Sequence, residues 1–159
     1  MSLLAETRNS VRHDYGDAIG RPVAALTTPA LLLDLPAAQR NIVRMAEAIG
    51  AMPAALRPHV KTHKSPELAR LQADAGAQGF STATVWEAVV LAEAGLDDLF
   101  VVNTIEGAAK IKRLAELARE RRVHVAVDDL GNAGRLSAAA VKAGATLGVL
   151  VEIDTGMRR

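Results

Sequence analysis

The feature that most constrains the fold is a regular alternation of two kinds of segment along the chain. From Pro29 onward, short apolar runs rich in β-branched residues alternate with longer alanine-rich amphipathic stretches, and the apolar runs begin roughly every 20 to 27 residues. This alternation is typical of βα units that build a parallel sheet. Strands are expected at 30–35, 56–63, 79–84, 98–103, 123–128 and 146–154, and helices between them are expected to end at Gly50, Gly76, Gly95, about Arg121 and Gly144.

Two architectures contain such units, an open doubly wound sheet and a (β/α)₈ barrel. An open sheet that binds nucleotides usually carries a glycine-rich turn after its first strand, whereas DLPAAQR follows here. The predicted fold class is therefore α/β, a (β/α)₈ TIM-type barrel. Because such a barrel usually takes about 250 residues, the chain is expected to be truncated after about six strands, with 1–26 as an N-terminal segment and 27–159 as a partial barrel.

Composition excludes several functional classes. Half of the residues are hydrophobic, and 19 basic and 18 acidic residues give a net charge of +1, so no basic footprint for nucleic acid is present. The absence of cysteine excludes disulfides and cysteine-ligated zinc, and it fits a reducing compartment. No apolar run approaches the roughly 20 residues of a spanning helix. The sequence predicts a soluble, cytoplasmic protein without nucleic-acid or membrane partners.

The segment RPHVKTHK (57–64) concentrates basic groups in an alanine- and leucine-rich chain. If it is a strand, Arg57, His59, Lys61 and His63 share one face. Four such groups in a row repel one another unless an anion or a covalent partner relieves them. A lysine among cations gives up its proton more readily, and a neutral amine is the form that attacks an aldehyde. Lys61 is therefore the candidate nucleophilic amine.

Two other interpretations of this segment stay open. Its charges could be solvated on an exposed edge strand or a loop. His59 and His63 also have the spacing that places two metal ligands on one face of a helix. On a strand, however, they would lie about 13 Å apart, too far to share an ion.

The C-terminal segment VLVEIDTGMRR combines acidic and basic groups around a glycine turn. Glu152 and Asp154 share one face of the expected strand, and the turn could bring Arg158 or Arg159 back toward the same end of the barrel. This pattern indicates a carboxylate that orients a guanidinium. From spacing alone, a surface salt bridge at a strand end is the better explanation.

Taken together, TPALLLDL, RPHVKTHKSPELARLQ, GFSTATVWEA and VEIDTGMRR resemble a known family. The resemblance is to the alanine racemase N-terminal family, the fold-type III pyridoxal phosphate enzymes, and within it to the D-threonine aldolase and D-serine dehydratase group. It runs from about Thr27 to the last residue. The P-H-x-K-T-H-K motif is specific to that group, whereas D-T-G-M-x-R also occurs in the racemases.

The resemblance implies a role for several residues. Lys61 is expected to bind the aldehyde of the cofactor covalently, Arg159 to contact the phenolic oxygen of its ring, and Glu152 to hold Arg159 in place. His59 and His63 are expected to line the same face. Gln72, Thr82 and Asn103 are weaker candidates, the last two because they end strands at the barrel mouth. The single tryptophan, Trp86, is expected to pack a helix against the barrel.

The resemblance also implies an activity and its requirements. We expect a pyridoxal 5'-phosphate-dependent carbon–carbon lyase that acts on D-3-hydroxy amino acids, in the first place a D-threonine aldolase that forms glycine and an aldehyde. The alternatives are a D-serine dehydratase and a non-catalytic carrier of pyridoxal phosphate. A divalent metal, with its ligands outside this chain, and a homodimer are expected of the full-length protein. The 159-residue chain alone is expected to be inactive and prone to associate through its unpaired strand edges.

Overall fold

The structure is a computed structural model that describes residues 16–157. The chain divides into two compact units, Met1–Ala38 and Gln39–Arg159, and each is described by itself. Within the part of the chain that the structure describes, no helix combines the length and the apolar character that a bilayer crossing requires.

The described part of the first unit contains one short helical turn and the start of a long helix. The turn is η1 (Val23–Ala25), and the helix is α2 (Leu35–Gly50), which continues into the second unit. The side chain of Asp34 caps α2, because its Oδ1 accepts a hydrogen bond of 2.9 Å from the N–H of Ala37. The predicted end at Gly50 is confirmed.

The strand expected at 30–35 is wrong. Residues 30–34 have no regular secondary structure, and Leu35 already belongs to α2. A strand is stabilised only by hydrogen bonds to a neighbouring strand, and no such ladder involves residues 30–34 within the described range. The leucines of this segment are consequently exposed, Leu31 completely.

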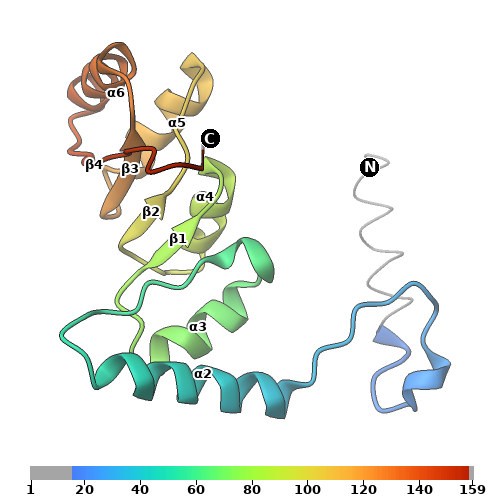
Figure 1. Ribbon diagram of the computed structural model, residues 1–159. Helices are drawn as coiled ribbons and strands as arrows, with labels where there is room; N and C mark the ends of the chain where they lie inside the picture. Colours follow the sequence, from blue (N-terminus) through green and yellow to red (C-terminus); the bar gives the residue numbers. More distant parts are fainter. Residues whose placement is uncertain (1–15, 158–159) are drawn as a thin grey trace, which may run out of the picture. The chain divides into compact units, whose positions relative to one another are not determined.

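The second unit is built on a parallel sheet of four strands covered by helices (Figure 1). The strands are β1 (Phe80–Thr82), β2 (Leu99–Val101), β3 (Val123–Val127) and β4 (Gly148–Val151). The helices are α3 (Pro66–Asp74), α4 (Val85–Glu93), α5 (Ala108–Leu117) and α6 (Leu130–Ala143). The expected strands three to six and all the expected helices are thus confirmed.

The order of the strands separates the two architectures that the sequence left open. The order is β1-β2-β3-β4, and every neighbouring pair is parallel. In a doubly wound sheet the order reverses at a switch point, whereas in a (β/α)₈ barrel consecutive strands are neighbours throughout. The sheet therefore has the barrel arrangement, with four strands within residues 16–157.

Alternation along each strand gives the sheet two different faces. The face toward the helices is apolar and almost completely buried, and it contributes Phe80, Leu99, Val101, Val123, Val125 and Val127 to the core. Leu91, Leu114 and Leu136 pack on this face from α4, α5 and α6. The opposite face carries Ser81, Phe100 and His124, which by the strand register lie side by side, and Ala126, which is two residues further along β3. In a closed barrel this second face is the interior.

The segment expected as the second strand, 56–63, is only partly extended. His59 forms a parallel bridge with Ser81, but the next residues form a 3₁₀ turn, η2 (Val60–Thr62). The N–H of Lys64 donates to the carbonyl oxygen of Val60 at 2.8 Å, so the backbone satisfies its hydrogen bonds locally instead of in the sheet. The strand prediction is therefore wrong beyond His59.

The outer strand β4 differs from the other three in its burial. Val149, Val151 and Ile153 point to the side that helices cover on β1 to β3, yet they are 51%, 74% and 74% exposed. No further strand pairs with the free edge of β4 within the described residues. This apolar edge fits the prediction of an unpaired edge, and it is a surface on which further structure could pack.

Candidate active site

The polar groups of the candidate site follow the carboxyl ends of the strands. The motif residues Lys61 and Lys64 lie in the loop after His59, whose bridge to Ser81 places this loop beside β1. Active sites of parallel barrels form at this edge, because the loops after the strands gather there.

Lys61 belongs to η2, and its side chain is exposed. Its backbone N–H donates a hydrogen bond of 3.3 Å to Nδ1 of His59. No ion pair to the ammonium group of Lys61 occurs among residues 16–157. The expectation that Lys61 shares a strand face with His59 is replaced by a turn that connects the two residues through one hydrogen bond.

His59 is a neutral neighbour of this lysine. Partial burial lowers the pKa of its imidazole, the positive charge of Lys61 lowers it further, and Glu87 and a hydrogen bond to the backbone of Ser81 oppose the decrease. Since Nδ1 accepts the Lys61 N–H, the ring proton is on Nε2. Because the net shift is downward, His59 adds little positive charge next to Lys61 near neutral pH.

The charge repulsion expected among Arg57, His59, Lys61 and His63 is therefore much weaker than the sequence suggested. His59 is mostly uncharged near neutral pH, and Arg57 is bound to Asp98 at the other end of the strands, with Nη2 2.8 Å from Oδ1. The reason is the turn at 60–62, which breaks the strict alternation on which the expectation depended.

Glu87 is a site residue that the sequence analysis missed. Its side chain is only 13% exposed, its Oε2 accepts a hydrogen bond of 2.8 Å from the N–H of Ala83, and its Oε1 lies 3.5 Å from Nζ of Lys64. The available signal was T-x-x-E at 84–87, a helix-start pattern immediately after an expected strand. Glu87 therefore connects the carboxyl end of β1 to the motif loop.

His63 closes the motif loop. Its Nδ1 accepts a hydrogen bond of 3.1 Å from the N–H of Ser65, the residue that caps α3. Its Nε2 is buried without a partner among the described residues. A buried donor that is left unpaired is destabilising, so this atom is available to a ligand or an ordered water.

Thr82 does not join this group. It is completely buried on the helix side of β1, and its hydroxyl lies 3.5 Å from the carbonyl oxygen of Phe100, to which it donates. The residue of β1 on the His59 side is Ser81. This placement does not support a direct contact between Thr82 and a cofactor.

The two other weak candidates lie on different elements. Asn103 donates from Nδ2 to the carbonyl oxygen of Ala83 at 2.8 Å, which joins the carboxyl ends of β1 and β2. Gln72 lies on α3 and lines a cavity of about 200 Å³ next to α2. Asn103 is thus close to the site, whereas Gln72 belongs to the helical layer.

The expectation that Trp86 packs a helix against the barrel is wrong. Its side chain is 58% exposed, because α4 buries its other face through Val85, Ala88, Val89 and Ala92. Trp86 instead lines a shallow cavity of about 330 Å³ together with Lys64 and Glu87.

The second predicted group follows β4. Glu152 is exposed, and its N–H donates to the carbonyl oxygen of Val127 at 2.8 Å, so it continues the β3–β4 ladder. The predicted turn is present, because Oδ1 of Asp154 accepts a 2.8 Å hydrogen bond from the N–H of Gly156. Arg158 and Arg159 lie outside the described residues.

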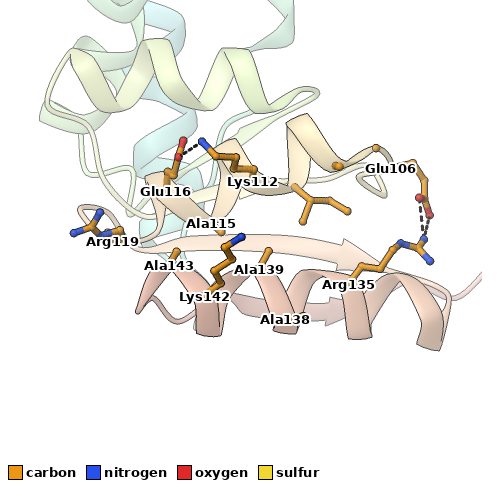
Figure 2. A pocket seen from close by; sticks show the side chains of 13 residues that line it. Glu106, Lys112, Ala115, Glu116, Arg119, Arg135, Ala138, Ala139, Lys142 and Ala143 are labelled. Carbon is orange, nitrogen blue, oxygen red and sulfur yellow. Dashed lines mark hydrogen bonds and ion pairs between the residues drawn. The ribbon is translucent and has the colours of Figure 1, made fainter.

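A larger cavity than the one beside Lys64 and Glu87 lies away from this edge. It is an open groove of about 1020 Å³ between α5 and α6, floored by alanines (Figure 2). Arg135 binds both carboxylate oxygens of Glu106 at one end, at 2.6 and 2.9 Å, and Lys112 pairs with Glu116 on α5. Because no motif residue lines this groove, cavity size does not identify the site here.

The comparison with protein families assigns the chain to a known domain. Residues 33–159 match the model described as "Alanine racemase, N-terminal domain". The chain therefore belongs to the alanine racemase N-terminal domain family, and the barrel arrangement of its strands agrees with this assignment.

Several curated relatives are enzymes of D-hydroxy amino acids. The chain is 41% identical to D-threonine aldolase of Arthrobacter sp, over 88% of this chain and 37% of that protein. It is 40% identical to 3-hydroxy-D-aspartate aldolase of Paracoccus denitrificans, over 94% of this chain and 39% of that protein. It is 35% identical to D-threo-3-hydroxyaspartate dehydratase of Delftia sp., over 84% of this chain and 35% of that protein.

A solved structure gives the same result in three dimensions. The crystal structure of D-threonine aldolase from Filomicrobium marinum superposes with a TM-score of 0.84 and 42% sequence identity, covering 86% of this chain and 37% of that one. The chain thus spans less than two fifths of the length of the relatives that it matches.

Proposed function

We propose that this chain is the N-terminal part of a pyridoxal 5'-phosphate-dependent lyase that cleaves D-3-hydroxy amino acids, in the first place a D-threonine aldolase. One observation carries the proposal. Lys61, an exposed lysine without an ion pair among the described residues, follows the segment beside β1 at the active-site edge of a barrel-type sheet, in a chain 41% identical to a D-threonine aldolase.

The residues at this edge fit the proposed cofactor. An aldehyde requires a primary amine that no carboxylate holds, and Lys61 meets this requirement among the described residues. The neighbouring His59 has a lowered pKa, so it adds little charge beside that amine. Nε2 of His63 has no hydrogen-bond partner among the described residues, so it could bind a polar group of the cofactor. Lys61 would hold the aldehyde end, with His59 and His63 beside it.

Each residue then has a limited task. His59 fixes the backbone of Lys61 through Nδ1, which keeps the amine at a constant place relative to β1. Pyridoxal phosphate, when bound, supplies an electron sink for the bond that breaks at the α-carbon of the substrate. We further propose that Arg159 meets the ring oxygen of the cofactor and that Glu152, next to β4, orients it.

A dehydratase is the second candidate function. The 35% identity to D-threo-3-hydroxyaspartate dehydratase supports it, because that relative matches the same region of the chain. Both candidates would use Lys61 in the same way. They differ in the bond that breaks, between Cα and Cβ in an aldolase or between Cα and its hydrogen in a dehydratase.

The remaining requirements are also proposals. A divalent metal would polarise the substrate hydroxyl. No group of three histidine, cysteine, aspartate or glutamate side chains suited to a metal occurs within residues 16–157, so we propose ligands outside this range. We also propose a cytoplasmic homodimer; sedimentation and fractionation of the full-length protein test these two points.

The products of the reaction distinguish the candidates. The full-length protein, supplied with pyridoxal phosphate and D-threonine, is expected to form glycine and acetaldehyde, and the products are measured by chromatography. Formation of ammonia and a 2-oxo acid from D-3-hydroxyaspartate would favour the dehydratase. Cofactor binding without turnover of either substrate would leave only the carrier.

A readout independent of turnover tests the site itself. Borohydride treatment in the presence of pyridoxal phosphate should attach the cofactor permanently to the peptide that contains Lys61, as measured by mass spectrometry. A chelator should abolish turnover but leave this attachment intact. Attachment at scattered lysines only would contradict the proposed site.

A further inference from the structure

The K-T-H-K loop contains two lysines, and only one can be the residue that captures the cofactor. Lys61 and Lys64 are three residues apart, and both side chains are exposed. Exposure alone therefore gives no reason for one to react rather than the other. The difference between them is an ion pair, because Nζ of Lys64 lies 3.5 Å from Oε1 of Glu87.

Glu87 is held in place from two sides. Its other carboxylate oxygen, Oε2, accepts the N–H of Ala83 at 2.8 Å, and its own N–H donates to Oγ1 of Thr84 at 3.2 Å. Its side chain is 13% exposed, compared with 66% for Lys64. A carboxylate fixed in this way is a rigid anchor for the more mobile ammonium group, and partial burial strengthens their attraction relative to a surface pair.

The backbone of Lys64 indicates that the anchor acts on the whole loop. Lys64 has φ +52°, a left-handed conformation that is uncommon for residues other than glycine. Such conformations are unfavourable for a residue with a side chain and persist where the surroundings impose them. Here the hydrogen bond from the Lys64 N–H to Val60 and the ion pair to Glu87 act at the two ends of the same residue.

We propose that Glu87 makes Lys61, and not Lys64, the lysine that captures the cofactor, by engaging the ammonium group of Lys64 and fixing the turn between them. Glu87 is thus a positioning residue, and this inference rests on the proposed function. In the capture step a C=N bond forms between Nζ and the aldehyde carbon, two amine hydrogens are lost, and the aldehyde oxygen leaves as water. The carboxylate of Glu87 holds Nζ of Lys64 at 3.5 Å, whereas no carboxylate holds Nζ of Lys61 among the described residues, so Lys61 keeps its amine free to meet the aldehyde.

The experiment measures which lysine is labelled. The full chain is incubated with pyridoxal phosphate, borohydride reduces the C=N bond to a secondary amine, and mass spectrometry gives the fraction of label on each lysine. The wild-type protein should carry the label on Lys61. In Glu87→Gln, which keeps the shape of the side chain, we expect at least a threefold increase in the Lys64 to Lys61 labelling ratio.

The chain offers a matched control on α5. Lys112 is paired with Glu116, and Glu116→Gln releases it as Glu87→Gln releases Lys64. No increase in labelling of Lys112 is expected, because no cofactor site is near it. An equal increase at Lys112 would mean that release of any lysine is sufficient, and it would overturn the proposal.

The remaining outcomes separate this inference from the proposed function. If wild type is labelled on Lys61 and Glu87→Gln gives the same ratio, Glu87 does not make the selection although the function stands. If wild type captures no cofactor, the proposed function fails and this inference with it. Should Glu87→Gln not fold, Glu87→Asp withdraws the carboxylate from Lys64 by one methylene and should change the ratio in the same direction; an unchanged ratio would count against the proposal.

A direct readout of the charge of Glu87 is the NMR titration of His59, whose pKa should fall further in Glu87→Gln.

Discussion

The two edges of the sheet use charged residues in opposite ways. At the amino edge, Asp98 precedes β2 and is surrounded by Arg57, Arg122 and His124, with its Oδ1 2.8 Å from Arg57 and 3.4 Å from His124. At the carboxyl edge, Lys61 has no ion-pair partner among the described residues, and Nε2 of His63 is buried without a hydrogen bond.

Within one short segment, residues at one end therefore stabilise the fold, and residues at the other end are available for the proposed chemistry. Arg57 and Lys61 are only four residues apart, yet the first binds a partly buried carboxylate and the second is exposed. In barrels the amino ends of the strands stabilise the fold and the carboxyl ends carry the active site. A segment that runs along the sheet therefore contributes to both, according to which end each residue occupies.

The two edges should differ most in cofactor capture. Lys61→Ala is expected to abolish the borohydride-stable attachment at residue 61 completely, because no other side chain can form that bond there. Its effect on the free energy of unfolding should stay within about 0.5 kcal/mol, since the side chain is exposed. Mass spectrometry and urea denaturation measure the two quantities. A large loss of stability would place Lys61 with the amino-edge residues instead.

The next largest effect is expected at Gly79, which lies against the amino-edge cluster. A Cβ at this position would collide with the guanidinium of Arg57 and would lie 2.5 Å from the carbonyl oxygen of Asp98. Its φ of +155° is also unfavourable for a residue with a side chain. Gly79→Ala should therefore destabilise the protein by about 3 kcal/mol.

The control for Gly79 is Gly134, a glycine inside α6 with nothing within 4 Å of an added Cβ. Gly134→Ala should be neutral or stabilise by up to about 1 kcal/mol, because alanine is the better helix former. Urea denaturation measures both variants. Equal effects of the two substitutions would show that the close approach at Gly79 has no energetic consequence.

A moderate effect is expected from the guanidinium of Arg57. Its Nη1 and Nη2 donate to the carbonyl oxygen and to Oδ1 of Asp98, at 2.5 and 2.8 Å. Arg57→Met keeps the apolar stem and removes both bonds, which should lower the free energy of unfolding by about 2 kcal/mol. Lys112→Met breaks an exposed ion pair on α5 and should change it by less than about 0.5 kcal/mol. A similar loss in both variants would contradict a special role for the amino-edge cluster.

The sequence predicted the parts of the fold that depend on local patterns. The helix end at Gly50 and caps such as Asp34 and Ser65 can be recognised without knowledge of the neighbours. The strands at 30–35 and 56–63 failed because apolar content and alternation do not reveal whether a partner strand is present, or that a turn at 60–62 satisfies the backbone instead.

In the candidate site, too, the sequence identified residues within one motif but not their partners elsewhere in the chain. The motif identified Lys61 and His59, but the partner of Lys64 is Glu87, 23 residues further along the chain on α4. The burial of Thr82 on the helix side of β1 also follows from the register, which the sequence does not specify to one residue. Contacts between residues far apart in the sequence therefore could not be predicted from the sequence and were found only in the structure.

The smallest expected effect is a pH dependence of stability that originates at the carboxyl edge. The pKa of His59 in the folded protein lies below the unfolded value of 6.5, because of burial and the charge of Lys61. Well above pH 6.5 neither state binds the proton appreciably, and this contribution to the stability is fully present. As the pH falls below 6.5 the unfolded chain binds the proton first, so the free energy of unfolding decreases until the pH passes the lower folded-state pKa.

Urea denaturation between pH 7.5 and about 5 can isolate this effect, because the carboxyl groups with lowered pKa values titrate in a more acidic range. For Asp97, burial raises the pKa, but hydrogen bonds from the backbone of Arg122 and Asp98 outweigh it and leave the pKa below its usual 3.8. His59→Gln should reduce the slope relative to wild type, whereas Asp97→Asn should not change it in this range. Parallel curves for wild type and His59→Gln would show that His59 takes up its proton equally in both states, which would contradict the lowered pKa of His59 at the carboxyl edge.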